Sequence, residues 1–504
     1  MTVRYYYIFV ILLLAACSGG SSSTSGEDKK DTIPSTTAAK ELTVGVSTGV
    51  TLRSIGVELD PHFFSQNLPL NNGAKTEDWD NIVVKRVKLM GIQSFRVMVL
   101  PSWYEPANDN DDPNTINWGG FTFNSTEMQS LYKVLDLAES QKIQVTLNLW
   151  GAPRGNFLAG SLSNDWVVFP QNIDEWCENF SALIQYLINT KKYTCIKEIT
   201  PLNEPNSFSN SSLDYANMCK TLHNRFSKDG IRDRVSFDLS DNTDQGGSHT
   251  YLTDCVSYLK DVADVYNSHT YIFGYNTVNS TISNWESLNH QLTKSASKNH
   301  FVGEFGSDQC VGSSRQTDIN LYERGILMTR IVINLLNGGA SGVNYWQLFD
   351  QYYSKTDPYS AMQQLGLWKY VKKVYSSETY YSSIKSDYEV RPQYYAYSLL
   401  TRFLRSGAEI HPIPTGEDYF AGTAVKNSDG KWVYVFANPT SKEKKISLTN
   451  GRGNATGTYQ VYRYVKGELP TTDEMINSAS QTVSVTDKLT YTVPALSTVL
   501  LKQN

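Results

Sequence analysis

Eight short apolar runs, separated by longer amphipathic stretches, recur between about Ser54 and Lys355. Each run has the length of a buried strand, and the stretches between them carry apolar residues at helical spacing, as in Trp79–Met90 with Gly91 as its stop. Strands that alternate with helices over about 300 residues are typical of a (β/α)8 barrel. The predicted strands are Ser54–Asp60, Ser94–Leu100, Gln144–Trp150, Ile196–Leu202, Val235–Ser240, Val262–Thr270, His300–Gly306 and Gly342–Leu348.

The apolar period changes after this region. A helix is predicted over Arg391–Arg405, and short runs with period two follow it, as expected for a β-sandwich of about 100 residues. Glu41–Ser47 precedes the barrel and is a candidate for an extra sandwich strand. We therefore predict an α/β chain with a TIM barrel at 41–390 and a β-sandwich domain at 391–504. The sandwich is either a packing partner of the barrel or a carbohydrate-binding module. The predicted sandwich strands are Tyr419–Val425, Trp432–Asn438, Lys445–Leu448, Gly457–Tyr464, Thr482–Val485 and Leu489–Leu501.

The N-terminus has the pattern of a secretory signal. A basic residue at Arg4 precedes the apolar run Tyr5–Leu14, which is too short to span a bilayer, and small residues follow it. The ending Leu-Ala-Ala-Cys17 resembles the lipobox of bacterial lipoproteins, which implies that Cys17 carries the lipid; a plain signal peptide is the alternative. Residues 18–40 are rich in Ser, Gly and Thr and are predicted to form a flexible tether. We expect a protein anchored to a bacterial membrane, at the outer membrane or cell surface.

Charge and composition narrow the classes of partner. The net charge is −5 and no long basic block is present, so nothing indicates a nucleic acid. Aromatic residues make up 12% of the chain, which suits either a sugar-binding surface or an aromatic core. No His-Glu-x-x-His run occurs, and the cysteines beyond Cys17 lack the paired spacing of a zinc site. We expect no metal, no cofactor and a monomer.

Two predicted strands end in glutamates. The fourth runs into Asn203-Glu204-Pro205, and the seventh contains Glu304. Because reacting groups lie at the C-terminal ends of barrel strands, both carboxyl groups are expected in one pocket. Glycoside cleavage needs one protonated carboxyl group that gives its proton to the leaving oxygen. It also needs an ionised one that attacks the anomeric carbon. We predict Glu204 as the acid/base and Glu304 as the nucleophile.

These motifs resemble those of the clan A glycoside hydrolases, which include families 5, 30 and 39. The resemblance implies a (β/α)8 barrel, an acid/base in Asn203-Glu204 and a nucleophile at Glu304. It covers the whole barrel, and the sandwich resembles the accessory domain of families 30 and 39. The resemblance further implies an Arg that steadies the nucleophile, a His/Tyr pair beside it and a Trp that forms the floor of the sugar pocket. The matching residues are Arg96, His269, Tyr271 and Trp346.

The predicted substrate-binding residues surround the two glutamates. Asn203 is expected to donate to the sugar 2-hydroxyl, and Glu58, Asp60 and His62 are further candidates for contacts with hydroxyl groups. A structural ion pair for Arg96, or ordinary packing for the other side chains, is the alternative role. The substrate-binding set is Arg96, Asn148, Trp150, Asn203, His269, Tyr271 and Trp346, with Trp103 and Tyr104 as candidates for more distant subsites.

The predicted function is retaining hydrolysis of β-glycosidic bonds in a glucan, mannan or xylan, with endo action favoured over exo. The alternative is a cell-surface lipoprotein that binds glycan without cutting it, although such a protein need not keep both Glu204 and Glu304. A metal-dependent deacetylase or lyase on the same barrel would need ligands that the sequence does not show.

Overall fold

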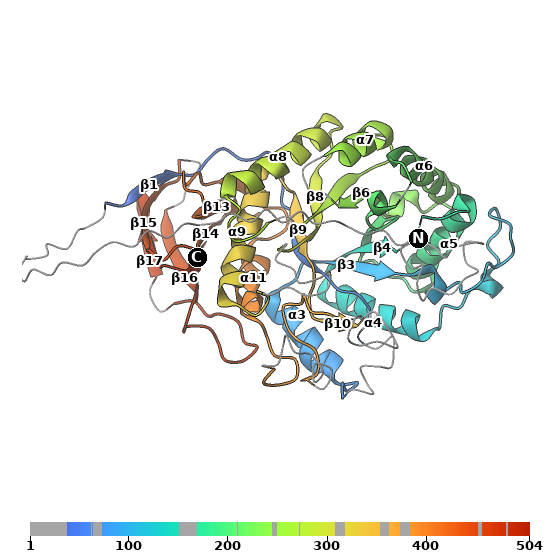
Figure 1. The fold of residues 1–504 in the computed structure, drawn as a ribbon, viewed down its shortest axis with the longest axis horizontal. Coiled ribbons are helices and arrows are strands. Elements are labelled where there is room, and N and C mark those ends of the chain that lie inside the picture. The colour runs from blue at the N-terminus through green and yellow to red at the C-terminus, as the bar shows by residue number, and fades with distance from the viewer. Residues whose placement is uncertain are drawn as a thin grey trace, which may run out of the picture. The chain divides into compact units, whose positions relative to one another are not determined.

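The computed structural model forms one compact unit over Ala39–Asn504 (Figure 1). The predicted signal peptide, Cys17 and almost all of the predicted tether lie outside the described residues, and so do His62 and Cys310. No helix in the described part of the chain has the length and apolar character needed to cross a membrane. The structure describes residues 38–61, 63, 73–150, 169–208, 210–243, 249–271, 273–307, 318–352, 362–372, 384–451, 456–479 and 482–504.

Eight parallel strands close into a barrel in sequence order, with the last strand paired to the first. All eight fall within or close to the predicted ranges, so the predicted TIM barrel is confirmed. The strand interiors are buried almost without exception, as expected for parallel strands covered by helices. The barrel strands are β2 (Ser54–Glu58), β3 (Ser94–Val99), β4 (Gln144–Leu149), β5 (Ile196–Thr200), β6 (Ser236–Thr243), β7 (Val265–Thr270), β8 (His300–Phe305) and β9 (Gly342–Tyr345).

Local signals set the helix ends. Gly91 ends the first long helical segment in the left-handed region at φ 60°, which favours glycine. Ser211 and Asp214 form a reciprocal capping box at the start of α6. The longer helices are η1 (Trp79–Val84), α3 (Lys85–Met90), α4 (Thr126–Gln141), α5 (Ile173–Gln185), η4 (Tyr186–Thr190), α6 (Ser212–Lys228), α7 (Thr250–Leu259), α8 (Asn279–Ser295), α9 (Tyr322–Gly338) and α11 (Pro392–Phe403). Single turns are η2 (Pro101–Trp103), η3 (Trp118–Gly120), η5 (Pro205–Ser207) and η6 (Arg232–Arg234).

The C-terminal region forms two sheets with a shared apolar core. The expected extra strand is present, because β1 (Lys40–Thr43) pairs in parallel with β15. The single strand predicted over Leu489–Leu501 is wrong: β18 and β19 belong to different sheets, and the chain crosses between them around Pro494. The other strands are β12 (Glu409–Pro412), which was not predicted, β13 (Ala421–Lys426), β14 (Trp432–Asn438), β15 (Lys444–Thr449), β16 (Gly457–Val465), β17 (Thr482–Val485), β18 (Lys488–Val493) and β19 (Ser497–Gln503). A small hairpin, β10 (Gln351–Tyr352) with β11 (Met362–Gln363), follows the barrel.

The barrel and the sandwich share a packed junction. Helix α11 lies against α9 of the barrel. The rings of Tyr322 and Tyr464 stack with centroids 4.6 Å apart, and the Tyr464 hydroxyl donates to the Tyr322 carbonyl. Buried Arg391 forms a bidentate ion pair with Asp350 just before α11. These contacts couple the sandwich to the side of the barrel.

Candidate active site

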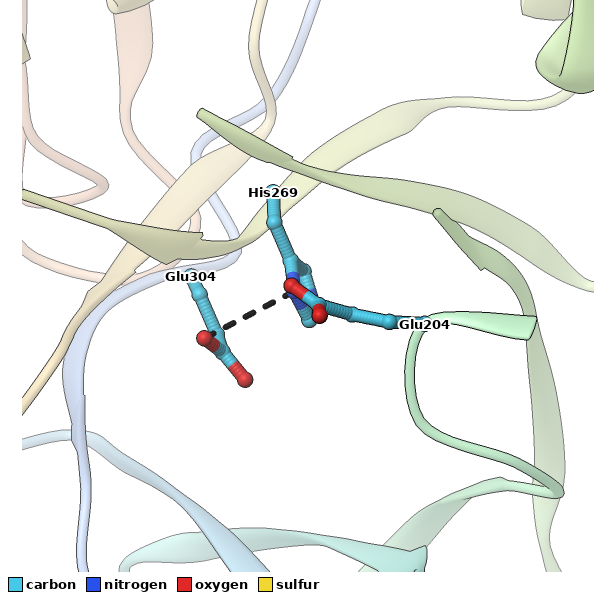
Figure 2. Close-up of side chains that lie close together, drawn as sticks. All are labelled: Glu204, His269 and Glu304. Atoms are coloured by element: carbon cyan, nitrogen blue, oxygen red, sulfur yellow. Dashed lines mark hydrogen bonds and ion pairs between the residues drawn. The ribbon is translucent and has the colours of Figure 1, made fainter. Parts of the chain in front are cut away.

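The two glutamates singled out in the sequence reach one another across the barrel mouth. Glu304 lies in β8, and Glu204 follows β5 with a left-handed backbone (φ 43°) that starts η5. A carboxylate oxygen of each and a ring nitrogen of His269 lie within 4.8 Å of one another. Figure 2 shows the two carboxyl groups extending from opposite sides toward the His269 ring. This separation fits the shorter of the two spacings found in glycosidases, about 5–5.5 Å, at which the second carboxylate acts as nucleophile.

Arg96 holds four groups from the centre of the barrel. Its guanidinium is 1% exposed. Nη1 donates to Glu304 Oε1 at 2.6 Å and to Glu58 Oε2 at 3.0 Å. Nη2 donates to Asn203 Oδ1 at 2.7 Å and to Asp241 Oδ2 at 2.9 Å. Because a guanidinium only donates, the Asn203 oxygen must face it, which leaves the Asn203 amide NH2 as a donor.

His269 joins the acid/base candidate to the buried network. Nδ1 lies 2.9 Å from Glu204 Oε1 and 3.6 Å from Glu304 Oε2, and Nε2 lies 3.0 Å from Asp241 Oδ1. Burial alone lowers the pKa of His269, but the carboxylates of Glu304 and Asp241 outweigh it and raise the pKa to about 10. The ring is therefore an imidazolium at neutral pH. While protonated, it has no lone pair to offer a metal.

Asp241 is the functional residue that the sequence analysis missed. It is fully buried and accepts hydrogen bonds from Arg96, His269 and Asn148, the last at 3.0 Å. Its backbone carbonyl also accepts from the Glu204 N–H. Burial alone raises the pKa of Asp241, but Arg96 and His269 outweigh it and hold the pKa at about 2. Asp241 is thus an anion that orients both cations of the site.

The nucleophile candidate has a donor on each oxygen. The Tyr271 hydroxyl donates to Glu304 Oε2 at 2.9 Å, while Arg96 occupies Oε1. Burial raises the pKa of Glu304, His269 and Arg96 oppose that rise, and the nearby charge of Glu204 adds to it. Because the two glutamates lie so close, the negative charge of Glu204 disfavours ionisation of Glu304.

Three residues of the predicted substrate-binding set, Arg96, Asn148 and His269, are at most 1% exposed and act through the carboxylates. Arg96 donates to Glu304, as the resemblance implied, and His269 contacts Glu204. Glu58 and Asp60 are also fully buried. Burial raises the pKa of Glu58 well above its usual range, against the opposing charge of Arg96.

The predicted aromatic residues divide into two groups. Trp150 and Trp346 follow β4 and β9 and stack on one another, with ring centroids 5.8 Å apart and planes inclined by 13°. Both residues are nearly buried, with exposed fractions of 6% and 5%. Tyr104 instead turns into the core, where its hydroxyl donates to Asn179. Its predicted role in a distant subsite is therefore wrong.

Comparison with solved structures places the fold among family 30 glycoside hydrolases. The catalytic domain of a family 30 xylanase C from Talaromyces cellulolyticus is 16% identical, with 92% of this chain and 100% of that chain covered and a TM-score of 0.61. A family 30 subfamily 8 xylanase from Clostridium acetobutylicum is 12% identical, with 92% and 100% covered and a TM-score of 0.63. An endo-β1,6-glucanase is 15% identical, with 93% and 94% covered and a TM-score of 0.61. The fold therefore agrees with the resemblance to clan A glycoside hydrolases found in the sequence.

Sequence comparison adds no closer relative. No family model matches the chain, and no curated protein matches it in sequence.

Proposed function

We propose that the protein hydrolyses β-glycosidic bonds of a polysaccharide with net retention, using Glu304 as nucleophile and Glu204 as acid/base. The observation that supports this most is the spacing of the two carboxyl groups, whose nearest ligand oxygens lie within 4.8 Å. The unequal surroundings of the pair support the assignment of roles. Glu304 is held by Arg96 and Tyr271, whereas the Glu204 side chain is 29% exposed and reachable by water.

The first half of the reaction forms an ester. A Glu304 oxygen attacks the anomeric carbon while the bond to the leaving oxygen breaks, and Glu204 gives its proton to that oxygen. The ester removes the negative charge of Glu304. Glu204 then has no second carboxylate charge beside it, and the His269 imidazolium donates to it.

The second half returns the enzyme to its starting state. Glu204 takes a proton from water, and the resulting hydroxide oxygen bonds to the anomeric carbon as the ester bond to Glu304 breaks. The Asn203 amide NH2, oriented by Arg96, donates to the sugar 2-hydroxyl, a contact that strengthens in the transition state. Trp150 and Trp346 provide apolar edges for packing against the sugar ring.

The names of the structural neighbours support a proposal for the substrate class. Two of them are described as xylanases and one as an endo-β1,6-glucanase. Endo action on a xylan or a β-glucan is therefore the leading proposal, and a mannan is the next. We also propose that Cys17 is lipidated and tethers the enzyme to the outer membrane or cell surface. A Cys17→Ser variant that still partitions with membranes would contradict this anchor.

A panel of defined β-linked polysaccharides, with product sizes resolved, tests the function. The set should contain β-1,4-xylan, β-1,4-mannan and β-glucans of 1,3, 1,4 and 1,6 linkage. We expect one class to be cut into oligosaccharides and the Glu304→Gln variant to lose about 10⁴-fold or more of that activity. Binding without cleavage by the parent would instead favour a glycan-binding lipoprotein. Cleavage by Glu304→Gln at the parental rate would contradict the assigned nucleophile.

A further inference from the structure

A second group of carboxyl groups lies outside the active site, where the segment after β3 meets α5. Glu105 follows η2, Asp109 lies four residues further on, and Glu178 lies in α5. One carboxylate oxygen from each lies within 4.8 Å of the other two. Sequence position does not explain the convergence, because Glu178 is far along the chain from the other two.

Glu178 points to a missing ligand. Its side chain is 0% exposed, and neither carboxylate oxygen receives a hydrogen bond. Asp109 Oδ1 and Glu175 Oε2 are also buried without a donor. Glu105 differs, because it accepts from the Asp109 N–H at 3.0 Å and from Asn179 Nδ2 at 2.7 Å. Two of the three clustered residues, Asp109 and Glu178, therefore carry buried oxygens without donors, and buried acceptors without partners are costly.

The chain supplies little positive charge to this point. Within the described residues, no ion pair joins Glu105, Asp109 or Glu178 to a Lys, Arg or His. Arg225 is the nearby cation, but its Nε donates to Asp229 and its Nη1 to the Pro113 carbonyl. Among the described residues, these carboxylates therefore have no cationic partner that the chain itself supplies.

We propose that Glu105, Asp109 and Glu178 bind a divalent cation of the Ca²⁺ type, with Glu175 at the edge of the site. The ligand set consists of oxygens alone, which hard cations prefer. Calcium holds its oxygens at about 2.3–2.6 Å, so two ligands of one ion lie at most about 5 Å apart, as these do. Mg²⁺ demands a smaller, near-ideal octahedron, whereas Ca²⁺ accepts a wider and less regular arrangement of oxygens. This site departs from the sequence-based expectation of a chain without metal.

The cation would act as a structural link. It joins the segment that leaves β3 to the second turn of α5, beside the strand ends that carry the active site. It touches no reacting group, so it is expected to raise the thermal midpoint of unfolding without changing kcat well below that temperature. The site is thus independent of the proposed glycosidase activity.

Calcium titration of the full chain, after treatment with a chelator and dialysis, tests the proposal. We expect one saturable site by calorimetry and by Tb³⁺ luminescence, which nearby Tyr104 sensitises. Saturating calcium is expected to raise the thermal midpoint by several degrees. Glu178→Gln and Asp109→Asn are expected to weaken calcium binding at least tenfold. Glu443→Gln, an exposed change in the sandwich, is the matched control and should bind like the parent.

Three outcomes would overturn the site. The first is a parent chain that neither binds millimolar calcium nor gains thermal stability from it. The second is parental calcium affinity in both Glu178→Gln and Asp109→Asn, since both variants keep the shape of the side chain and remove only a charge. The third is magnesium binding as tight as calcium binding, which contradicts the assigned ion. A tenfold or larger preference for calcium that is lost in both variants supports it.

Discussion

The carboxyl groups around Arg96 and those around Glu178 are buried in the same barrel but meet different partners. In the first region, four carboxyl groups, those of Glu58, Glu204, Asp241 and Glu304, surround the cations of Arg96 and His269. In the second, the carboxyl groups converge without any paired cationic side chain in the described residues. Burial costs are similar in the two regions, but only the first is compensated by the chain itself.

The difference indicates what each region is built to do. Internal cations that belong to the chain keep Asp241 ionised and His269 charged, so the glutamates face fixed positive charge throughout a reaction cycle. A region without such cations is neutral only when it holds protons or a metal. Its charge therefore depends on the solution, which suits a structural link and not a preorganised catalytic site.

After Glu304→Gln, the largest effect is expected for Glu204→Gln in the first region. Loss of the acid/base should lower kcat by about 10²–10⁴-fold on polysaccharide. Substrates with an activated leaving group need no proton, so their first step should be spared. Added azide should then restore turnover and yield a β-glycosyl azide, because a small anion can replace the deprotonated base. Steady-state kinetics with and without azide check this, and absence of any azide effect would contradict the role of Glu204.

Asp241→Asn should destabilise the chain by about 3–5 kcal/mol, because it leaves Arg96 and His269 buried with one anion fewer. Denaturation in urea, followed by tryptophan fluorescence, measures the change. The pKa of His269, measured by NMR, should fall in the same variant. A loss of less than about 1 kcal/mol would show that Asp241 does not carry the charge balance of the site.

Arg96→Met should lower kcat/KM by about 10²–10³-fold through the position and charge of Glu304. The sign of the pH effect follows from the ion pair. Arg96 lowers the pKa of Glu304, and the nucleophile must be ionised, so its removal should move the acidic limb of the pH profile to higher pH. Arg96→Lys, which keeps the charge, should restore part of that shift. A profile that does not move in Arg96→Met would indicate a purely structural arginine.

The His269 network should make stability depend on alkaline pH. The folded pKa of about 10 lies above the ordinary value of 6.5, so this contribution is complete below pH 6.5 and is lost as the pH rises toward 10. The slope is at most about 1.4 kcal/mol per pH unit. Thermal scans from pH 6 to 10 should therefore show the parent losing its advantage over His269→Asn. A constant difference between the two across this range would contradict the charged state of His269.

The smallest effect is expected in the second region, and it has the opposite sign. With chelator present, Glu178→Gln should be more stable than the parent by about 1 kcal/mol, because folding of the parent must either protonate Glu178 or bury its charge without a partner. With calcium present, the parent should be the more stable protein. Thermal scans under both conditions give the comparison. Destabilisation by Glu178→Gln in chelator would show that the chain already compensates this carboxylate.

Much of the fold follows from local patterns in the sequence. Each barrel strand is a continuous apolar run, and each helix carries apolar residues at helical spacing. The spacing and length of these segments therefore suffice to place the elements. Glu204 and Glu304 could be found because they are polar residues at strand ends. The strands of the sandwich were harder to predict. The sequence from β18 to β19 has the pattern of one apolar strand, although the chain changes sheet around Pro494.

The residues that were missed or misplaced owe their positions to barrel geometry, which the spacing of apolar residues alone does not specify. Asp241 sits where the pairing of β6 with β7 shifts between Ser240 and Asn242, and a bulge of this kind redirects a side chain. The predicted strand ended at Ser240, so the polar residue directly after it was the available signal. Asn148 and Glu58 were predicted to reach the sugar but are buried deeper in the barrel. The depth of a side chain depends on strand tilt and stagger, which the sequence pattern does not give.

Product stereochemistry tests the central claim most directly. Time-resolved proton NMR of the first product released from the polysaccharide that the enzyme cuts shows its anomeric configuration before mutarotation. Because Glu304 lies close enough to Glu204 to act as a nucleophile without room for an intervening water, the β-anomer should appear first. Initial release of the α-anomer would mean that water attacks directly, and the roles assigned to Glu204 and Glu304 would be wrong.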